Sequence, residues 1–245
     1  MDKNALIKAM EPFGLALSDY YDGKKVGELI MHRDDGSEDV HPAEYYFREP
    51  SDFSLIEKEA LKICKGKVLD IGAGVGPHSL ELQKLGMNVF SIDVSQHVCS
   101  IMKKRGLKNV ECMSFYEFCD INQGKFDTIL LLGRSIGFVE TLNGLKKFLN
   151  QSKSVLNQNG NIIFDSTDIR PTTKPIHLAY QKNNQDQGRY LGEIRIRMEY
   201  NGLMGDYFQI LHVDPDILEK IVLESGLKSE FVIKEESSYL VRIFK

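Results

Sequence analysis

One aspartate and three glycines form the most informative pattern in this sequence. They lie in the run VLDIGAGVGPHS, residues 68–79, and are Asp70, Gly72, Gly74 and Gly76. Glycine adopts positive φ and lets a ligand approach the backbone closely, and the proline that follows suits the first turn of a helix. The run therefore predicts a strand, a glycine-rich turn and a helix whose N-terminal amides face an electronegative part of a cofactor.

A second acid, Asp93, ends the next apolar run, which reads SIDVS. A carboxylate about 20 residues beyond a glycine turn can accept both hydroxyls of a ribose. Dinucleotide sites favour the spacing GxGxxG, whereas the spacing here is GxGxG and Asp70 precedes the first glycine. A carboxylate at that position repels a pyrophosphate and attracts an ammonium or a sulfonium. S-adenosylmethionine carries both cations and no phosphate, so the residues favour it over NAD.

Strands and helices that alternate along the chain must position these groups. The predicted strands cover residues 68–71, 89–92, 110–113, 128–132 and 162–164. The predicted helices between them cover residues 77–85, 96–105 and 142–156. Unbroken apolar runs such as ILLL suit a sheet that is covered by helices on both faces. We expect an α/β fold with a doubly wound, mostly parallel seven-stranded sheet.

The segment before this core predicts two helices and a short strand. Residues 1–22 are typical of an amphipathic helix that is interrupted near Pro12, and a short strand fits residues 28–32. A further helix over residues 52–64 can be capped by Ser51 and Asp52.

The end of the chain departs from the βα pattern. Residues 193–200 alternate strictly between apolar and charged side chains, and the Asn-Gly pair that follows predicts a hairpin to a second strand around 206–213. Ile194, Ile196, Met198 and Tyr200 share the apolar face. A helix over 215–225 and an antiparallel pair of strands at 229–234 and 239–244 complete the chain.

We expect one domain with four parts. These are an N-terminal cap (1–50), a cofactor-binding core (51–165), an inserted β-hairpin lid (166–214) and a C-terminal helix with its strand pair (215–245). Long insertions usually have a function, and one at the carboxyl ends of the strands can cover the ligand crevice. The alternatives for the insertion are an oligomer contact or a simple extension of the sheet.

These features resemble the class I (Rossmann-like) S-adenosylmethionine-dependent methyltransferases, over roughly residues 52–166. The resemblance implies that Asp70 orients the methionine amino group, that Asp93 holds the ribose hydroxyls and that Val94 packs on the adenine. It also implies a set of residues that line the cofactor: Gly72, Ala73, Gly74, Gly76, Ser114, Phe115, Leu132 and Gly133. Many relatives have an aspartate where this chain has Ser114, so here Ser114 would hydrogen-bond the adenine and Phe115 would stack on it.

Candidate acceptor residues form no recognisable triad, and no catalytic residue is assigned. They include Arg134, Asp165, His177, Tyr180, Tyr207 and His212. Arg134 either borders the reactive space or is a surface residue paired to an acid. Asp165 and Asp168 in FDSTD allow a hard-metal site, but we favour capping and pocket-lining roles and expect no metal. Methyl transfer is an in-line displacement, so a base is needed only if the acceptor must lose a proton first.

Composition narrows the class of substrate. The net charge of −4 offers no excess of cations for phosphate backbones, and the chain lacks both the [DN]PP[YF] sequence of amino-base methyltransferases and a Pro-Cys nucleophile. Neither a signal peptide nor an apolar run of about 20 residues is present, and the four scattered cysteines indicate a cytoplasmic protein. We expect a small-molecule methyltransferase, with no nucleic-acid or membrane partner. A non-catalytic S-adenosylmethionine-binding module and a nucleic-acid or protein methyltransferase are the alternatives.

Overall fold

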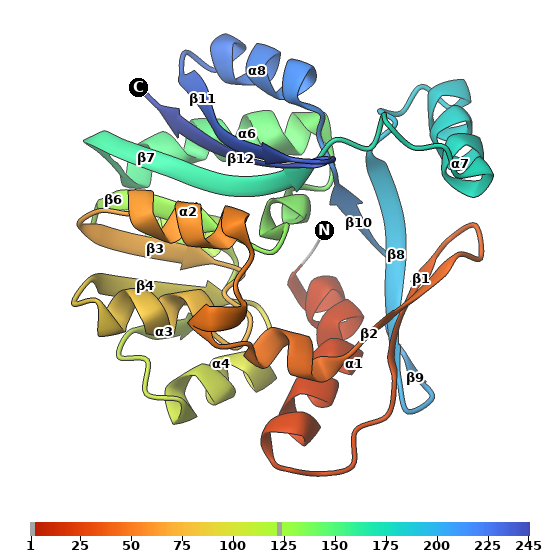
Figure 1. Cartoon of the computed structure of the whole chain (residues 1–245), viewed down its shortest axis with the longest axis horizontal. Coiled ribbons are helices and arrows are strands. Elements are labelled where there is room, and N and C mark those ends of the chain that lie inside the picture. Colours follow the sequence, from red (N-terminus) through yellow and green to blue (C-terminus); the bar gives the residue numbers. More distant parts are fainter. Residues whose placement is uncertain (1–2, 122–123) are drawn as a thin grey trace.

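The computed structural model describes residues 3–121 and 124–245, and within them the larger sheet has seven strands (Figure 1). Their spatial order is β11-β12-β7-β6-β3-β4-β5, in which neighbours from β7 to β5 run parallel and β12 is antiparallel to both β7 and β11. The strands are β3 (Lys67–Ile71), β4 (Asn88–Asp93), β5 (Val110–Cys112), β6 (Phe126–Leu131), β7 (Leu156–Thr167), β11 (Lys228–Glu235) and β12 (Ser238–Phe244). The predicted, mostly parallel sheet and its antiparallel C-terminal pair are confirmed.

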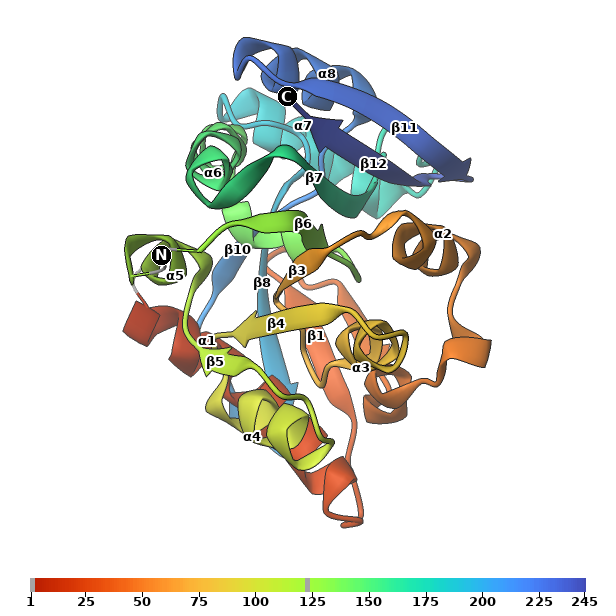
Figure 2. The same ribbon diagram turned by 90° about the vertical axis from the view of Figure 1, so that its left-hand side faces the viewer.

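Helices cover both faces of this sheet, as the view in Figure 2 shows. One face carries α2 (Leu55–Ile63), α3 (Pro77–Lys84) and α4 (Gln96–Lys104), and the other carries α5 (Phe115–Ile121), α6 (Leu142–Val155) and α8 (Pro215–Glu224). Successive strand residues point to opposite faces, so Leu69 packs with the α6 side and Val68 packs with the α2 side. This alternation of apolar side chains makes the sheet doubly wound.

The start of α2 differs from the prediction. Ser54, rather than Ser51 or Asp52, is the N-cap: its hydroxyl accepts from the Glu57 amide, and the Glu57 carboxylate accepts from the Ser54 amide. This reciprocal pair satisfies two amides that a helix otherwise leaves unpaired, which explains why the helix begins at Leu55. The residues before it form short 3-10 turns instead, η1 (Ala43–Phe47) and η2 (Pro50–Asp52).

A second, antiparallel sheet joins segments from both ends of the chain. Its strands are β1 (Leu29–Arg33), β2 (Glu38–His41), β8 (Glu193–Tyr200), β9 (Leu203–Met204) and β10 (Phe208–Leu211). They lie in the order β10-β8-β1-β2, with β9 paired to β8. We call this five-stranded layer the small sheet.

The predicted hairpin is right at its turn and wrong in its extent. Asn201 and Gly202 have φ of 49° and 79° and connect β8 to β9, but β9 has only two residues. The strand expected around 206–213 forms only at 208–211, and the other edge of β8 is paired by β1. Sequence periodicity identifies a strand but not a partner that lies far away in the chain.

Helix α1 (Lys3–Tyr21) lies between the two sheets (Figure 1). The predicted apolar face of β8 packs on it, because Ile196 and Met198 share a buried cluster with Phe13 and Leu17 of α1. Val98 in α4 belongs to the same cluster, so α1 is also seated on the cofactor-binding half. One continuous core therefore connects the small sheet, α1 and the region of the glycine loop.

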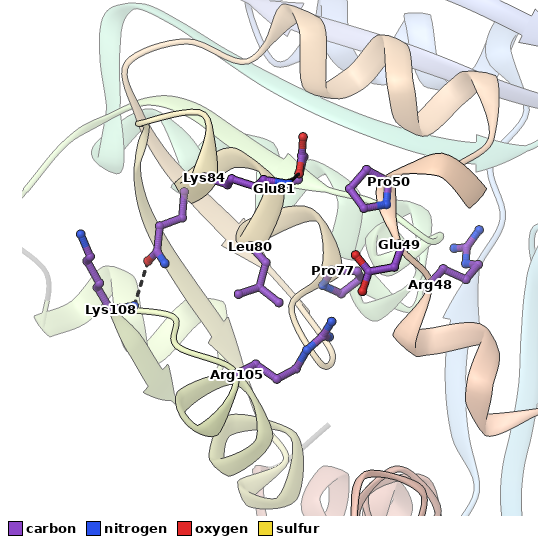
Figure 3. A pocket seen from close by; sticks show the side chains of 10 residues that line it. Arg48, Glu49, Pro50, Pro77, Leu80, Glu81, Lys84, Arg105 and Lys108 are labelled. Atoms are coloured by element: carbon purple, nitrogen blue, oxygen red, sulfur yellow. Dashed lines mark hydrogen bonds and ion pairs between the residues drawn. The ribbon is translucent and has the colours of Figure 1, made fainter.

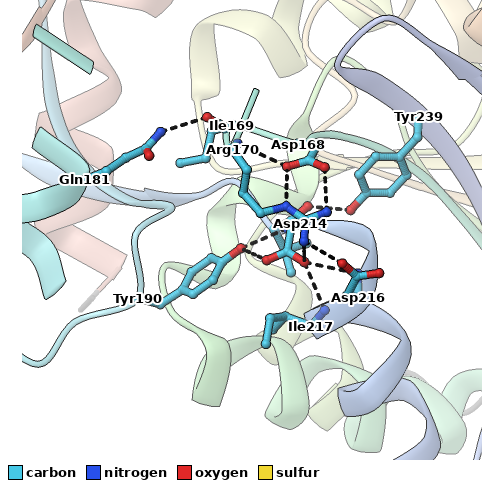
Figure 4. Close-up of polar contacts among 10 residues, drawn as sticks. Asp168, Ile169, Arg170, Gln181, Tyr190, Asp214, Asp216, Ile217 and Tyr239 are labelled. Atoms are coloured by element: carbon cyan, nitrogen blue, oxygen red, sulfur yellow. Dashed lines mark hydrogen bonds and ion pairs between the residues drawn. The ribbon is translucent and has the colours of Figure 1, made fainter. Parts of the chain in front are cut away.

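The two ends of the inserted segment are fastened together (Figure 4). Arg170, just after β7, forms ion pairs with Asp168, Asp214 and Asp216. The Tyr190 hydroxyl donates to Asp214 at 2.6 Å and accepts from the Asp214 amide at 2.9 Å, while Asp214 caps α8. Between these ends the segment carries α7 (Pro175–Asp186) and strands β8 to β10.

No helix in the described residues is both long and apolar enough to cross a bilayer.

Candidate active site

The glycine loop joins β3 to α3 at the carboxyl end of the large sheet. Gly72, Gly74 and Gly76 have φ of 66°, 57° and 77°. A Cβ added to Gly76 would lie 2.6 Å from a methyl group of Leu107, so packing requires this glycine. A Cβ added to Gly74 would meet no atom of the described residues within 4 Å. The backbone at Gly74 therefore faces open space from which a ligand can approach it.

Asp93 fastens the loop to the end of β4. One carboxylate oxygen accepts from the Gly74 amide at 3.1 Å, and the other accepts from the Ser95 amide at 3.0 Å. Burial raises the pKa of Asp93 to about 6, against the lowering effect of these amide hydrogen bonds. Its side chain stays partly exposed and has no ion pair within the described residues. Asp93 is thus free to accept further donors from a ligand.

Asp70 lies below the loop and is only 2% exposed. Its carboxylate accepts from the Ser79 hydroxyl at 2.6 Å, and Ser79 lies 2.7 Å from the Ser91 hydroxyl. Burial raises the pKa of Asp70. These bonds connect β3 to α3 and β4, whereas the contact of Asp70 with a methionine amino group stays a prediction.

The polar groups of this site fit a ligand that has a ribose and a positive charge. Asp70 and Asp93 are both acidic, and Gly74 offers open backbone at the same edge of the sheet. A glycine loop after one strand and an acid after the next, at the carboxyl ends of a doubly wound sheet, define a Rossmann-like cofactor-binding protein. S-adenosylmethionine meets the demands of these residues without the repulsion that a pyrophosphate would meet at Asp70.

The three residues predicted to contact the adenine differ in their exposure and in their contacts. Val94 follows Asp93 and is partly exposed. The Ser114 hydroxyl donates to Glu117 at 2.9 Å and caps α5, and the Phe115 ring is 2% exposed and packs 4.9 Å from the Phe148 ring. Phe115 thus belongs to the core, and nothing supports the stacking role predicted for its ring.

A tight turn after β6 lies against the glycine loop. Gly133 and Arg134 have φ of 68° and 63°, and Leu132 before them is buried. The Ser135 hydroxyl lies 2.7 Å from the Leu132 carbonyl and 3.1 Å from the Gly72 carbonyl. This hydroxyl holds the turn against the loop, as expected if both border one ligand. The 3-10 helix η3 (Ser135–Val139) follows.

The structure brings Arg134 and Asp165 together. The Arg134 amide donates to both Asp165 carboxylate oxygens, at 3.1 and 3.2 Å, and its side-chain Nε donates to the Thr167 hydroxyl at 3.1 Å. Burial raises the pKa of Asp165. No side-chain ion pair holds Arg134 within the described residues, so the alternative of a paired surface arginine does not describe it.

The charge of Arg134 also acts on His212, a predicted acceptor candidate, and on two residues that the sequence did not indicate, His41 and Tyr46. Burial and the Arg134 charge together lower the pKa of His41 and bring that of His212 to about 4, while burial raises the pKa of Tyr46 to about 12. The Nδ1 atom of His212 is buried without a hydrogen-bond partner in the described residues. His41 lies opposite Leu29 in the small sheet, on the face that packs on α1.

The remaining acceptor candidates lie elsewhere. The Tyr180 hydroxyl donates to Asp34 and accepts from the Arg195 amide, and the Tyr207 ring packs against the Arg195 and Arg197 guanidiniums. These arginines occupy the face of β8 opposite to the one that packs on α1. His177 is on α7, 3.3 Å from the Thr172 hydroxyl. The structure does not bring these three candidates together with Arg134 and Asp165.

The surface hollow in Figure 3 is separate from the residues described above. It encloses about 370 Å³ between η2 and α3, and its lining contains neither Asp93 nor Arg134. Its charged groups are largely engaged: Arg105 donates to the Val75 carbonyl, and Arg48 pairs with Glu57. Glu57 also contacts His78 at 2.8 Å. Burial raises the pKa of Glu57, but the hydrogen bonds with His78 and Ser54 outweigh it and lower this pKa to about 2.

Comparison with known proteins assigns the family. A family model described as a methyltransferase domain matches residues 69–164. An S-adenosylmethionine-dependent methyltransferase from Bacteroides fragilis, crystallised with S-adenosyl-L-homocysteine, is 30% identical with a TM-score of 0.84, over 96% of this chain and 95% of that one. The sugar N-methyltransferase KedS8 from Streptoalloteichus sp. ATCC 53650 shares the fold, with 11% identity and a TM-score of 0.56 over 86% and 95% of the two chains.

A curated relative is the putative methyltransferase YqeM of Bacillus subtilis (strain 168), with 24% identity over 106 residues. The match spans 41% of this chain and 42% of that relative. The similarity to the Bacteroides protein extends over nearly the whole chain, so the chain belongs to the S-adenosylmethionine-dependent methyltransferases. S-adenosylmethionine, the predicted cofactor, is confirmed as the cofactor of this family.

Proposed function

We propose that the protein transfers the methyl group of S-adenosylmethionine to a small molecule held between the carboxyl ends of β6 and β7 and the small sheet. The supporting observation is the convergence at Arg134. Its backbone amide donates to Asp165 in β7. Burial and the positive charge of Arg134 both lower the pKa values of His41 in β2 and of His212, which follows β10. These groups come from separate elements, as is common where a fold builds a binding site.

In this proposal the glycine loop and Asp93 hold the cofactor, whose sulfonium supplies the reactive methyl group. The small sheet, α1 and the rest of segments 1–50 and 166–214 form the lid over the acceptor. Their buried core with α4 keeps this lid next to the glycine loop. A lid in this position would exclude water from the acceptor and would suit a small acceptor better than a polymer. All four cysteines are free thiols, which agrees with a protein that acts in the cytoplasm.

The test separates binding from transfer. S-adenosylhomocysteine should raise the melting temperature while NAD leaves it unchanged, because only the folded chain carries the glycine loop site. The protein is then incubated with methyl-labelled S-adenosylmethionine and cell extract that has been divided by ultrafiltration. A labelled product in the filtrate that chromatography separates from S-adenosylmethionine supports a small acceptor. Label in the retained RNA or protein contradicts it, and binding without any transfer favours the non-catalytic module.

A further inference from the structure

Arg134 has unused hydrogen-bonding capacity at the site. A guanidinium carries five N–H donors, and here only Nε is engaged, by the Thr167 hydroxyl. Its two terminal nitrogens have no hydrogen bond or ion pair within residues 3–121 and 124–245, and the residue is exposed.

The backbone holds Arg134 in a conformation that costs energy. Its φ of 63° is unfavourable for a side chain with a Cβ, and such strain tends to occur at functional sites. The conformation is fixed by the amide bond to Asp165 and by Ser135, which contacts the glycine loop. The side chain is then directed toward β7 by Thr167, away from β3 and Asp93.

The groups around the guanidinium leave its charge largely uncompensated. His212 and His41 are uncharged when burial and Arg134 lower their pKa values, and Tyr46 keeps its proton. The Asp165 carboxylate accepts from the Arg134 backbone amide and forms no ion pair with its guanidinium within the described residues. A planar fork of two free nitrogens beside neutral side chains matches the two oxygens of a carboxylate or phosphate group.

We propose that Arg134 selects the acceptor by binding an oxyanion group on it, so that the acceptor is a small acid. This inference rests on the proposed function and adds the chemical class of the acceptor. The direction of the side chain, toward Thr167, assigns it to the acceptor and not to the carboxylate of the cofactor.

The experiment measures how fast phenylglyoxal labels each arginine of the whole protein, followed by peptide mass spectrometry. The protein is first saturated with 5′-methylthioadenosine, which lacks the methionine carboxylate. We expect acetate or phosphate to slow labelling of Arg134 by about threefold or more relative to chloride at equal ionic strength. Comparing the protection given by acetate with that given by phosphate shows whether the site prefers a carboxylate or a phosphate group. Arg195, exposed on the opposite face of the small sheet and lacking an ion pair, is the control that oxyanions should not protect.

Two results would overturn the proposal. One is equal labelling of Arg134 with and without oxyanions. The other is protection by S-adenosylhomocysteine but not by 5′-methylthioadenosine, which would assign the guanidinium to the cofactor carboxylate. Calorimetry with Arg134→Gln and Arg134→Lys gives a second measurement. Both variants should bind S-adenosylhomocysteine within about threefold of the parent chain, since the side chain points away from the glycine loop. A parent chain that binds no S-adenosylhomocysteine would refute the proposed function, a result distinct from either outcome above.

Discussion

At the scale of single residues, Asp93 connects the ionisation of the site to cofactor binding. Its carboxylate already accepts two amides and has room for ribose hydroxyls, which need the charged form as acceptor. Its pKa is raised to about 6, so protons compete with the cofactor just below neutral pH. We expect the affinity for S-adenosylhomocysteine to fall about tenfold between pH 7 and pH 5, measured by calorimetry. Asp93→Asn should bind more weakly, by about 1–3 kcal/mol, and lose this pH step. A parent chain whose affinity is flat over that range would contradict the assignment.

Gly74 allows a matched test of the loop. Both Gly74 and Gly86 have positive φ and open space where a Cβ would be added, but only Gly74 lies on the cofactor side. Alanine at either position should cost about 1–2 kcal/mol of folding free energy, from the left-handed backbone alone. Gly74→Ala should in addition weaken S-adenosylhomocysteine binding at least tenfold, because the new methyl group occupies space needed by the ligand. Equal binding by the two variants would show that the cofactor does not contact this backbone.

At the scale of elements, α1 connects the small sheet to the cofactor-binding half, and Leu17 is one of its fully buried side chains. Leu17→Ala should lower the free energy of unfolding by about 2–5 kcal/mol, whereas Leu223→Ala, 73% exposed in α8, should change it by less than about 0.5 kcal/mol. Hydrogen exchange should quicken in α1 and β8 together and leave β3 protected. Even loosening of both sheets would mean that α1 is not a separate layer.

The elements that sequence could predict are those whose signals are local. The glycine loop, the strand ends at Asp70 and Asp93 and the turn at Asn201 follow from a few adjacent residue types. By contrast, α7 has a weak apolar pattern, and pairing of β1 with β8 joins residues far apart in the chain. His41 lies in β2, whose position depends on that pairing, so sequence alone did not indicate it. Arg134 and Asp165 could be proposed from the sequence because both lie close to the carboxyl ends of strands in the regular βα pattern.

At the scale of the whole molecule, the fastening at Asp214 fixes where the inserted segment leaves and re-enters the core. Asp214 is 2% exposed and contacts Arg170 and Tyr190 while it caps α8. Removing one member of such a buried network leaves the other members without a hydrogen-bond partner. We expect Asp214→Ala to lower the free energy of unfolding by about 3–5 kcal/mol in urea titrations.

The control is Asp216→Ala, whose side chain is 77% exposed and pairs with the same arginine. That variant should lose at most about 1 kcal/mol. If both substitutions cost the same, burial of Asp214 is not the source of its effect. Excising the insertion is a poorer test, because Ile196 and Met198 belong to the buried cluster that packs on α1.

The pairing of β1 with β8 also sets an order of events during synthesis. Strand β1 leaves the ribosome early, but its partner, residues 193–200, is made only when most of the chain exists. Contacts between distant segments carry a large loop-closure cost and form slowly. Strands β3 to β7 can meanwhile assemble from neighbours in the chain, with the glycine loop among them. The part of α1 that packs on β8 stays uncovered until residues 193–200 have been made. A nascent chain stopped before residue 193 should therefore hold a formed glycine loop and an N-terminus that chaperones still recognise.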